Sequence, residues 1–248
     1  MPDPAYVHAA FSAIASRYVA ANHLFSLGMD VLWRARAVQM VAEWKPTRLL
    51  DIATGTGDLA LDIHHALPEV QVLGVDFCEP MLEIARRRGL EHCLQADAMH
   101  LPLPDASYDA ATTAFGLRNM PDYAAALREF RRVLRPGGHL LVLDLGIPEG
   151  IAAAPYRLYL HHVLPRVAAC FAASADAYSY LGRSIEAFPR GRAFLELLTD
   201  AGYTAPVHVP LMGGIASIYT AETARMTNEP PTPCGFGVPS ECLPRCSS

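Results

Sequence analysis

Apolar residues along the chain form short runs separated by longer amphipathic segments, and this order predicts the fold. Five runs have the length and composition of buried strands, at residues 47–53, 71–76, 92–96, 108–115 and 139–145. The segments between them have helical signals: Glu79-Pro80 suits a helix start, and an apolar face recurs from Tyr123 to Leu134. Because strands and helices alternate, we predict an α/β domain with a mostly parallel, doubly wound sheet.

The segment before the first predicted strand has helical periodicity of its own. Apolar residues recur at helical spacing from Phe11 to Tyr18, and a second helical stretch over 31–41 follows a polar break at 22–23. We therefore expect an N-terminal helical extension over residues 1–46. In an open sheet the ligand crevice lies at the carboxyl ends of the strands, so this extension is either a lid over the site or an ordinary packing helix.

The pattern changes again after residue 146. Residues 149–180 fit helices in parts and contain no strand pattern, which predicts a helical insertion. A helix over 190–201 precedes two further strands near 203–209 and 213–220. Their link, Pro210-Leu211-Met212, is too short for a parallel crossover, so an antiparallel hairpin should complete a seven-stranded sheet in a domain over 47–222. The Pro-, Gly-, Ser- and Cys-rich residues 223–248 predict a disordered tail.

Composition narrows the class of protein. The 248 residues are 52% hydrophobic and 18% charged, which fits one globular domain, and a formal net charge of -5 argues against nucleic acid as the main partner. The N-terminus lacks a signal-peptide pattern and no apolar run has the length of a membrane span, so we expect a cytoplasmic protein. The six cysteines match no zinc spacing; we expect free thiols and no metal, with a disulfide or metal in the tail as the alternative.

A glycine-rich turn after the first predicted strand is the main chemical signal. Gly55, Gly57 and Ala60 fit the spacing of a dinucleotide loop, in which small residues let the backbone approach a ligand. Asp51 and Asp58 flank the turn, and no Lys or Arg occurs between positions 51 and 62. These acids would repel a pyrophosphate but suit S-adenosylmethionine, which has an ammonium, a sulfonium and one carboxylate. We predict S-adenosylmethionine as the cofactor, with an NAD-binding oxidoreductase as the rival and an ordinary βα turn as the structural alternative.

Five longer segments resemble the UbiE/MenG family, the C-methyltransferases of ubiquinone and menaquinone biosynthesis. They are Phe11–Tyr18, Phe115–Asn119, Arg132–Gly138, Asp176–Leu181 and Ser184–Pro189. The resemblance runs from about residue 8 to 222 and implies a class I S-adenosylmethionine-dependent methyltransferase, with a Rossmann-like sheet that ends in an antiparallel hairpin. It implies methylation of a prenylated quinol, either demethylmenaquinol or 2-polyprenyl-6-methoxy-1,4-benzoquinol. Methylation of another phenolic or polyketide-like molecule, or cofactor binding without catalysis, remain the alternatives.

The cofactor contacts follow from the loop and from the resemblance together. An acid at the end of the second predicted strand can accept the ribose hydroxyl protons, and the resemblance adds an acid and its neighbour after the third strand for the adenine. The expected cofactor-binding residues are Asp51, Gly55, Thr56, Gly57, Asp76, Asp97, Ala98 and Ala114. The chain departs from the family at Ala114, where Ser is common, and at Val19, where Asp is common. It also departs at Tyr219, near the end of the similar region, where the family usually has a segment that contains His. Cys78 replaces a usual Ser and should leave a helix without a side-chain cap.

The resemblance also gives candidates for catalysis and for substrate binding. Arg118 would stabilise a developing phenolate, or would instead pair with an acid and hold its loop. Asn119 would orient a ring hydroxyl, or would cap a helix begun by Pro121. Tyr18, Asp176, Tyr178 and Tyr180 are candidates for the substrate side. No general base stands out among the histidines.

The implied partner is a lipophilic quinol. The apolar surface of the 149–175 stretch suits a prenyl tail, but it equally suits core packing or packing between subunits. The resemblance leaves a homodimer and peripheral contact with the inner face of a membrane open.

Overall fold

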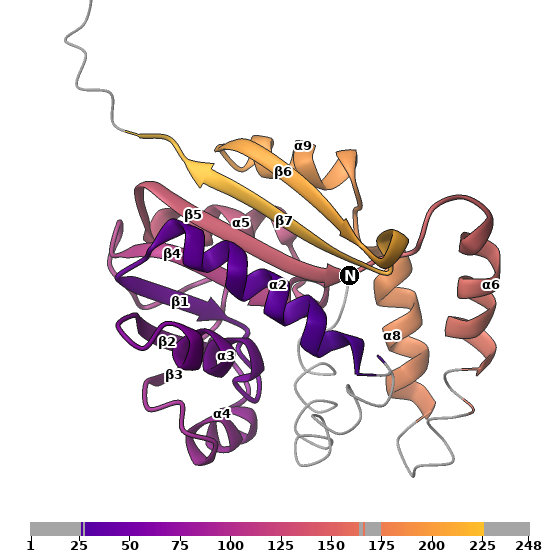
Figure 1. Cartoon of the computed structure of the whole chain (residues 1–248), viewed down its shortest axis with the longest axis horizontal. Helices are drawn as coiled ribbons and strands as arrows, with labels where there is room; N and C mark the ends of the chain where they lie inside the picture. Colours follow the sequence, from indigo (N-terminus) through magenta and orange to yellow (C-terminus); the bar gives the residue numbers. More distant parts are fainter. Residues whose placement is uncertain (1–25, 27, 164–165, 167–174, 226–248) are drawn as a thin grey trace, which may run out of the picture.

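A mixed seven-stranded sheet forms the centre of the protein in its computed structural model, which describes residues 26, 28–163, 166 and 175–225 (Figure 1). The strand order is β3-β2-β1-β4-β5-β7-β6, with β1 to β5 parallel and β7 antiparallel to both β5 and β6. The strands are β1 (Arg48–Ile52), β2 (Gln71–Asp76), β3 (Cys93–Gln95), β4 (Tyr108–Ala114), β5 (Leu134–Leu145), β6 (Tyr203–Leu211) and β7 (Ala216–Thr223).

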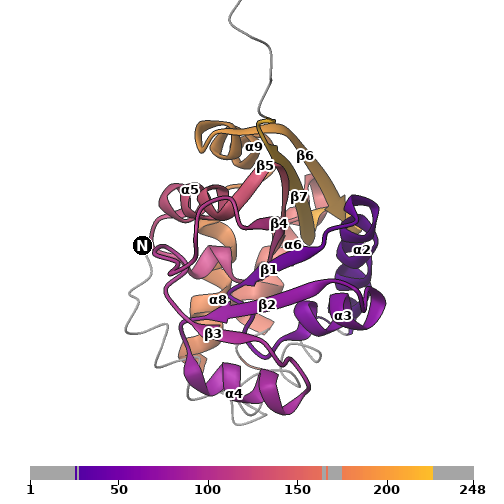
Figure 2. The same cartoon turned by 90° about the vertical axis from the view of Figure 1, so that its left-hand side faces the viewer.

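Helices cover both faces of the sheet, as Figure 2 shows. Apolar residues of α2 (Met29–Trp44), α3 (Asp58–Ala66) and α4 (Glu79–Arg87) form one core cluster with residues of the strands. A second cluster on the other face contains residues of α5 (Tyr123–Val133) and α9 (Arg192–Asp200). The sheet is therefore a buried layer between two helical layers, as its near-continuous apolar strands require.

A smaller group of helices lies beside the carboxyl ends of the parallel strands (Figure 1). It comprises the short turns η1 (Leu117–Asn119) and η2 (Gly150–Ala152), α6 (Ala153–Leu158), the π-helical η3 (Tyr159–Val163) and α8 (Ala175–Ala187). Leu160 of η3 and Ile185 of α8 pack with Ile147 in a cluster separate from the two main cores. Apart from η1, these elements lie between β5 and α9, where we expect a helical insertion over 149–180; α8 continues to Ala187, and the described part of the segment has no strand.

The sheet confirms the predicted fold class and the order of its elements. The largest difference is β5, which starts at Leu134 and not at 139, because Leu134 pairs with Tyr108 of β4. The hairpin is antiparallel as predicted, but Pro210 and Leu211 belong to β6 and the turn is η4 (Met212–Gly214).

The described part of the chain ends close to the expected domain boundary. β7 continues through Thr223, one residue into the segment that we assign to the tail. The Thr223 hydroxyl accepts from Gly138 N at 2.9 Å and donates to Arg135 O, so it closes the start of β5 against the end of β7. Residues 226–248 of the expected tail, and most of the N-terminal extension, lie outside the described residues.

The predicted helix after the polar break is α2. Its residues Ala37 and Val41 are fully buried against the sheet, and it contacts α3 and β5. α2 is therefore a packing helix over most of its length. Its first two turns contribute to a cavity in the structure, which is where a lid would lie.

Candidate active site

The strand order reverses between β1 and β4, and a cavity of about 320 Å³ lies at the carboxyl ends of these strands. In open α/β sheets this reversal point is where ligands bind. Residues from the start of α2, the glycine loop and the ends of β4 and β5 line one part of the cavity. Residues of α6, η3 and α8 and of the hairpin turn line the other part. The cavity thus joins the loop to the insertion.

Asp51, the next-to-last residue of β1, lies between two hydroxyl donors. Its two carboxylate oxygens accept from the hydroxyls of Thr54 and Thr112, each at 2.6 Å, and Thr112 lies opposite it on β4. Asp51 lines the cavity and is only 2% exposed. Burial raises the pKa of this carboxyl from 3.8 to about 6, although both hydroxyls oppose the shift. A cation in the cavity would find its counter-charge here.

Asp76 holds the glycine loop in place. Its carboxylate accepts from Gly55 N at 2.8 Å and from Cys78 N at 2.9 Å, so it joins the loop after β1 to the loop after β2. Gly57 has φ +81°, and a Cβ there would lie 3.2 Å from the Ala85 Cβ, so the turn requires glycine. Asp76 and Gly57 support the loop but do not line the cavity. Cys78 precedes α4 without a side-chain cap, as expected.

The charge around the loop differs from what its sequence neighbourhood indicates. Thr56 donates its hydroxyl to Asp58, and Arg88 donates to the Thr56 carbonyl and pairs with Asp58, both at 2.8 Å. Arg34 of α2 also lines the cavity, beside Asp30, with Nη1 donating to Asp30 at 2.6 Å. Arg88 therefore offsets the charge of the loop acid Asp58, and Arg34, which pairs with Asp30 and Asp62, adds a cation to the cavity wall. Both arginines are distant from the loop in sequence, so the absence of Lys and Arg between positions 51 and 62 does not describe the charge around the folded loop.

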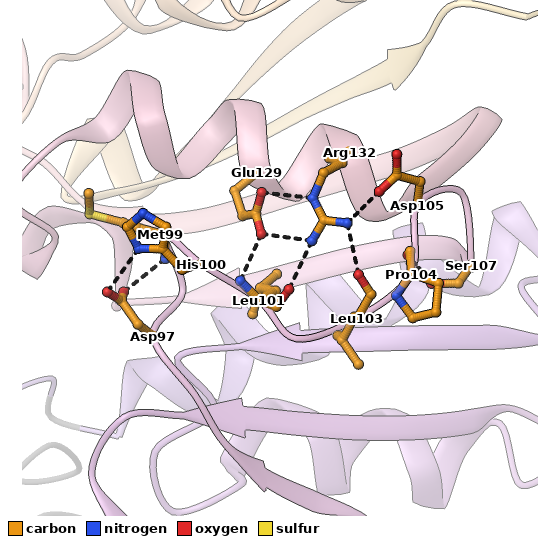
Figure 3. Close-up of polar contacts among 10 residues, drawn as sticks. All are labelled: Asp97, Met99, His100, Leu101, Leu103, Pro104, Asp105, Ser107, Glu129 and Arg132. Atoms are coloured by element: carbon orange, nitrogen blue, oxygen red, sulfur yellow. Dashed lines mark hydrogen bonds and ion pairs between the residues drawn. The ribbon is translucent and has the colours of Figure 1, made fainter.

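The loop that follows β3 is held by a half-buried pair of charged residues on α5 (Figure 3). Arg132 of α5 pairs with Glu129 through Nε at 2.9 Å and Nη2 at 2.8 Å, and it donates to the carbonyls of Leu101 and Leu103. Glu129 in turn accepts from Leu101 N at 2.7 Å, and these bonds to Arg132 and Leu101 help keep its pKa low. Arg132 belongs to one of the family-like segments, and its role here is structural.

The two residues expected at the adenine lie at the start of the same loop. Asp97 is exposed, and its carboxylate accepts from Met99 N at 2.9 Å and lies 3.4 Å from the His100 Nδ1 (Figure 3). Ala98 packs against the core. Neither residue lines the cavity between β1 and β4.

Arg118 lies on η1, directly after β4, and forms a buried ion pair with Asp144. Its Nη1 donates to Asp144 Oδ1 and to the Phe115 carbonyl, both at 2.6 Å, and its backbone N donates to Asp144 Oδ2 at 3.3 Å. Arg118 is 5% exposed and Asp144 is 1% exposed, yet Arg118 lines the cavity. Arg118 therefore does pair with an acid and hold its loop, which was one of the two expected roles. It also lines the cavity, which the other role requires.

The loop before Arg118 is packed tightly against the glycine loop. Phe115 has φ +57°, and a Cβ at Gly116 would lie 2.6 Å from the Ala53 Cβ. That contact explains the glycine in the family-like segment Phe115–Asn119. Ala114, just before it, lines the cavity.

Asn119 links η1 to α8. Its Nδ2 donates to the Phe115 carbonyl at 3.3 Å, and its Oδ1 accepts from the Tyr180 hydroxyl at 3.2 Å. The alternative in which Asn119 caps the next helix is wrong, because α5 starts at Tyr123 and Asp122 accepts from Ala125 N as its cap. Neither Asn119 nor Tyr180 lines the cavity.

The insertion gives the cavity an apolar end. Tyr156, Tyr159, Leu160, Leu181, Ile185 and Ile215 line this part. Burial raises the pKa of Tyr156 to about 12, although the nearby Arg118 opposes the shift, so its hydroxyl stays a neutral donor at physiological pH. His161 lies outside this lining, 3.1 Å from Glu186.

The predicted residues thus fall into three groups. Asp51, Gly55, Thr56, Ala114 and Arg118 meet at the cavity; Gly57, Asp76, Asp97, Ala98, Asn119 and Tyr180 lie around it. Tyr18 lies outside the described residues, as do the side chains of Asp176 and Tyr178. The sequence analysis missed Arg34, Arg88, Thr112 and Asp144. Asp144 could have been predicted from the sequence, because it is an acid near the carboxyl end of an apolar strand, like Asp51 and Asp76.

In the described ranges, no group of three or more His, Cys, Asp or Glu side chains could hold a metal ion. The same ranges contain no helix both long and apolar enough to cross a bilayer. Cys93 is a free thiol and Cys78 is buried, and the other four cysteines lie outside the described residues.

Comparison with known proteins places this arrangement in a family. The chain is 46% identical over 218 residues to a protein of Thermus thermophilus named demethylmenaquinone methyltransferase, which covers 86% of this chain and 99% of that protein. It is 44% identical over 216 residues to the ubiquinone/menaquinone biosynthesis C-methyltransferase UbiE of Syntrophotalea carbinolica, with 85% and 91% covered. Among solved structures, an S-adenosylmethionine-dependent methyltransferase of Thermotoga maritima, described as a possible histamine N-methyltransferase, has a TM-score of 0.64 at 21% identity, with 86% and 98% covered.

The solved structure, at that identity, supports the fold alone, which is the class I methyltransferase fold expected from the sequence. The family model for ubiE/COQ5 methyltransferases matches residues 2–223. This match takes in the sheet, the glycine loop, the insertion and the hairpin, so the chain belongs to the ubiE/COQ5 methyltransferase family.

Proposed function

We propose that the protein transfers a methyl group from S-adenosylmethionine to a ring carbon of a prenylated hydroquinone, with demethylmenaquinol as the substrate. The observation that carries this proposal is one cavity with two chemical ends, acidic and hydroxyl-rich at the glycine loop and apolar and aromatic at the insertion. The names of the similar proteins from Thermus thermophilus and Syntrophotalea carbinolica support the same reaction.

The residues at the polar end fit the proposed cofactor. When bound, S-adenosylmethionine supplies an electrophilic methyl group on a positively charged sulfur. Asp51 is a buried carboxylate with a raised pKa, which a nearby cation would lower again. The backbone at Gly55 has φ +56°, and no atom lies within 4 Å of where a Cβ would be, so the loop leaves room for a ligand. By the family resemblance, Asp76 takes the ribose and Asp97 with Ala98 the adenine; Thr56, Gly57 and Ala114 complete these proposed contacts.

The residues at the apolar end fit a hydroquinone ring. Arg118 lines the cavity where the two ends meet, and its fixed guanidinium would stabilise negative charge on a ring oxygen. Tyr156, which remains protonated, can donate to the same oxygen. We assign Asn119 a positioning role, because it holds the Tyr180 side chain against η1. The candidates Tyr18, Asp176 and Tyr178 stay proposals for the substrate side.

The prenyl tail of the proposed substrate is lipophilic, which bears on where the enzyme works. We propose a cytoplasmic protein that takes the quinol from the membrane surface, with the N-terminal extension as a lid and the first two turns of α2 as the part of it that lines the cavity. Ile151, at 99% exposure, and Leu158, at 59%, lie on η2 and α6, next to the apolar end of the cavity, and support contact with lipid. A homodimer remains part of this proposal as an alternative use of the same apolar surface.

The proposal is tested by product analysis. Purified protein, S-adenosylmethionine and chemically reduced demethylmenaquinol with a short prenyl tail should give a product heavier by one methylene, with the new methyl on the ring carbon. Parallel reactions with the prenylated methoxybenzoquinol and with a simple catechol test the other substrate classes. Methylation of the catechol on oxygen would overturn the quinol assignment, and cofactor binding without transfer to any ring would overturn the assignment as an enzyme.

Binding of the cofactor should depend on pH through Asp51. Because the pKa of Asp51 is raised to about 6, the Asp51 carboxyl of the free protein is protonated below that pH. The protonated carboxyl favours the folded state, and this contribution to stability is lost as the pH rises from about 4 through 6. A bound cation reverses the preference, so affinity for S-adenosylmethionine should rise by up to about tenfold per pH unit below 6 and level off above 7. Calorimetry from pH 5 to 8 measures this. An Asp51→Asn variant that keeps the wild-type slope would remove Asp51 as the titrating group.

A further inference from the structure

The polar end of the cavity contains a guanidinium with an unused edge. Arg34 lines the cavity and is 8% exposed. Its Nε donates to Asp62 Oδ2 and its Nη1 to Asp30 Oδ2, each at 2.6 Å. The Arg34 Nη2 has no hydrogen-bond partner among the residues that the structure describes. Two carboxylates therefore fix the plane of the guanidinium and leave Nη2 for a ligand.

The start of α3 lies beside this guanidinium. Asp62 is one turn into α3, so its bond to Arg34 places the guanidinium next to the first turn of that helix. The N-cap of α3 is Gly57, which has no side chain to bond the first backbone N–H groups, and Asp58 and Leu59 of this turn line the cavity. A helix of this length concentrates partial positive charge at that end and favours an anion there.

Three acids line this end of the cavity: Asp30, which pairs with Arg34, Asp58, which pairs with Arg88, and Asp51, for which the described residues provide no cationic partner. Asp51 lines the cavity from β1, across the glycine loop from α2. The one other cationic side chain among the described lining residues is Arg118, whose Nη1 is held by Asp144 and Phe115. Arg34 is thus the cation available for an anionic group near the loop, while Asp51 suits a cationic one.

We propose that Arg34 and the N-terminus of α3 bind the α-carboxylate of the cofactor's amino-acid portion, with Asp51 on the side of its ammonium. This assignment rests on the proposed function, because it takes S-adenosylmethionine as the ligand. It gives α2 a specific part in cofactor binding: the helix carries the residue that recognises the carboxylate, and Asp30 and Asp62 orient it.

The test compares two ligands that differ only in the carboxylate. Calorimetry measures the affinity of wild-type protein and of Arg34→Met for S-adenosylhomocysteine and for its decarboxylated analogue. Arg34→Met should weaken S-adenosylhomocysteine binding about 10- to 100-fold, the usual effect of losing a charged hydrogen bond, and should change binding of the decarboxylated analogue by less than about threefold. Equal losses for both ligands, or no loss for either, would overturn the proposal.

Arg88→Met is the matched control. Arg88 is also bonded to the glycine loop, through the Thr56 carbonyl and Asp58, but it does not line the cavity. Its loss should therefore weaken both ligands by the same factor. If Arg34→Met fails to fold, Arg34→Lys replaces it, because lysine keeps the charge but not the planar donor set, and a loss confined to the ligand with the carboxylate is again required.

The wild-type measurements separate this inference from the proposed function. A wild-type protein that binds neither ligand would contradict the proposed cofactor and this inference with it. A wild-type protein that binds both with equal affinity would leave the cofactor assignment intact and overturn only the role of Arg34.

Discussion

Asp144→Ala is expected to lower the free energy of unfolding by about 3–5 kcal/mol, because it leaves the Arg118 guanidinium buried without its counter-charge. Asp144 is 1% exposed, and beyond the ion pair it accepts backbone hydrogen bonds from Arg118 N and, at 2.8 Å, from Leu145 N. All of these donors would lose their acceptor in a part of the sheet where water does not replace it.

A thermal or urea melt of the apoprotein measures this change. In a protein of this size the expected loss corresponds to a fall in the melting temperature on the order of 10 °C. Glu196→Ala is the matched control, since the Arg192–Glu196 pair has a similar distance of 2.8 Å but is solvent-exposed, and it should leave the midpoint unchanged. The double variant Arg118→Met/Asp144→Leu should recover much of the stability, because it removes both buried charges. A single variant as stable as wild type would mean that the pair is open to water.

The sequence predicted the sheet well because its signals are local. The parallel strands β1 and β2 and the second half of β5 have apolar centres, and the short turn between β6 and β7 permits only an antiparallel hairpin. The start of β5 was missed for a physical reason: Arg135-Pro136-Gly137-Gly138 interrupts the apolar run, and only contacts with Tyr108 of β4 and with Thr223 at the far end of the chain make it a strand.

The site was predicted less completely because its charges meet across long sequence separations. Asp51 and the glycine loop could be found from their position after a strand. Arg34 and Arg88 could not, since α2 and the end of α4 reach the loop only through packing on the sheet face. The partner of Arg118 lies 26 residues away on the neighbouring strand, so a single sequence could suggest that an acid pairs with it but not which one.

Arg118→Lys is expected to reduce turnover on a quinol by about 10²–10³-fold, the usual cost of losing one preorganised donor at a developing charge. Lysine keeps the positive charge, but a single ammonium on a flexible stem cannot hold the Asp144 carboxylate and the Phe115 carbonyl as the planar guanidinium does. Affinity for S-adenosylhomocysteine should change by less than about threefold, because the bonds of Asp51 and Asp76 to the loop remain.

Single-turnover methyl transfer at saturating cofactor, with a thermal melt of the same variant, tests this expectation. Near-normal turnover would mean that Arg118 only braces the η1 turn, and the search for the electrostatic group would move to Tyr156. The decisive comparison is Arg118→Ala with and without added guanidinium. A group that acts directly on the ring oxygen can be replaced by a free guanidinium ion in the vacated space next to Asp144, so both the turnover and the melting temperature of the variant should rise with the concentration of the ion. Recovery of stability without recovery of turnover would assign Arg118 a purely structural role, since the ion would then have restored only the partner of Asp144.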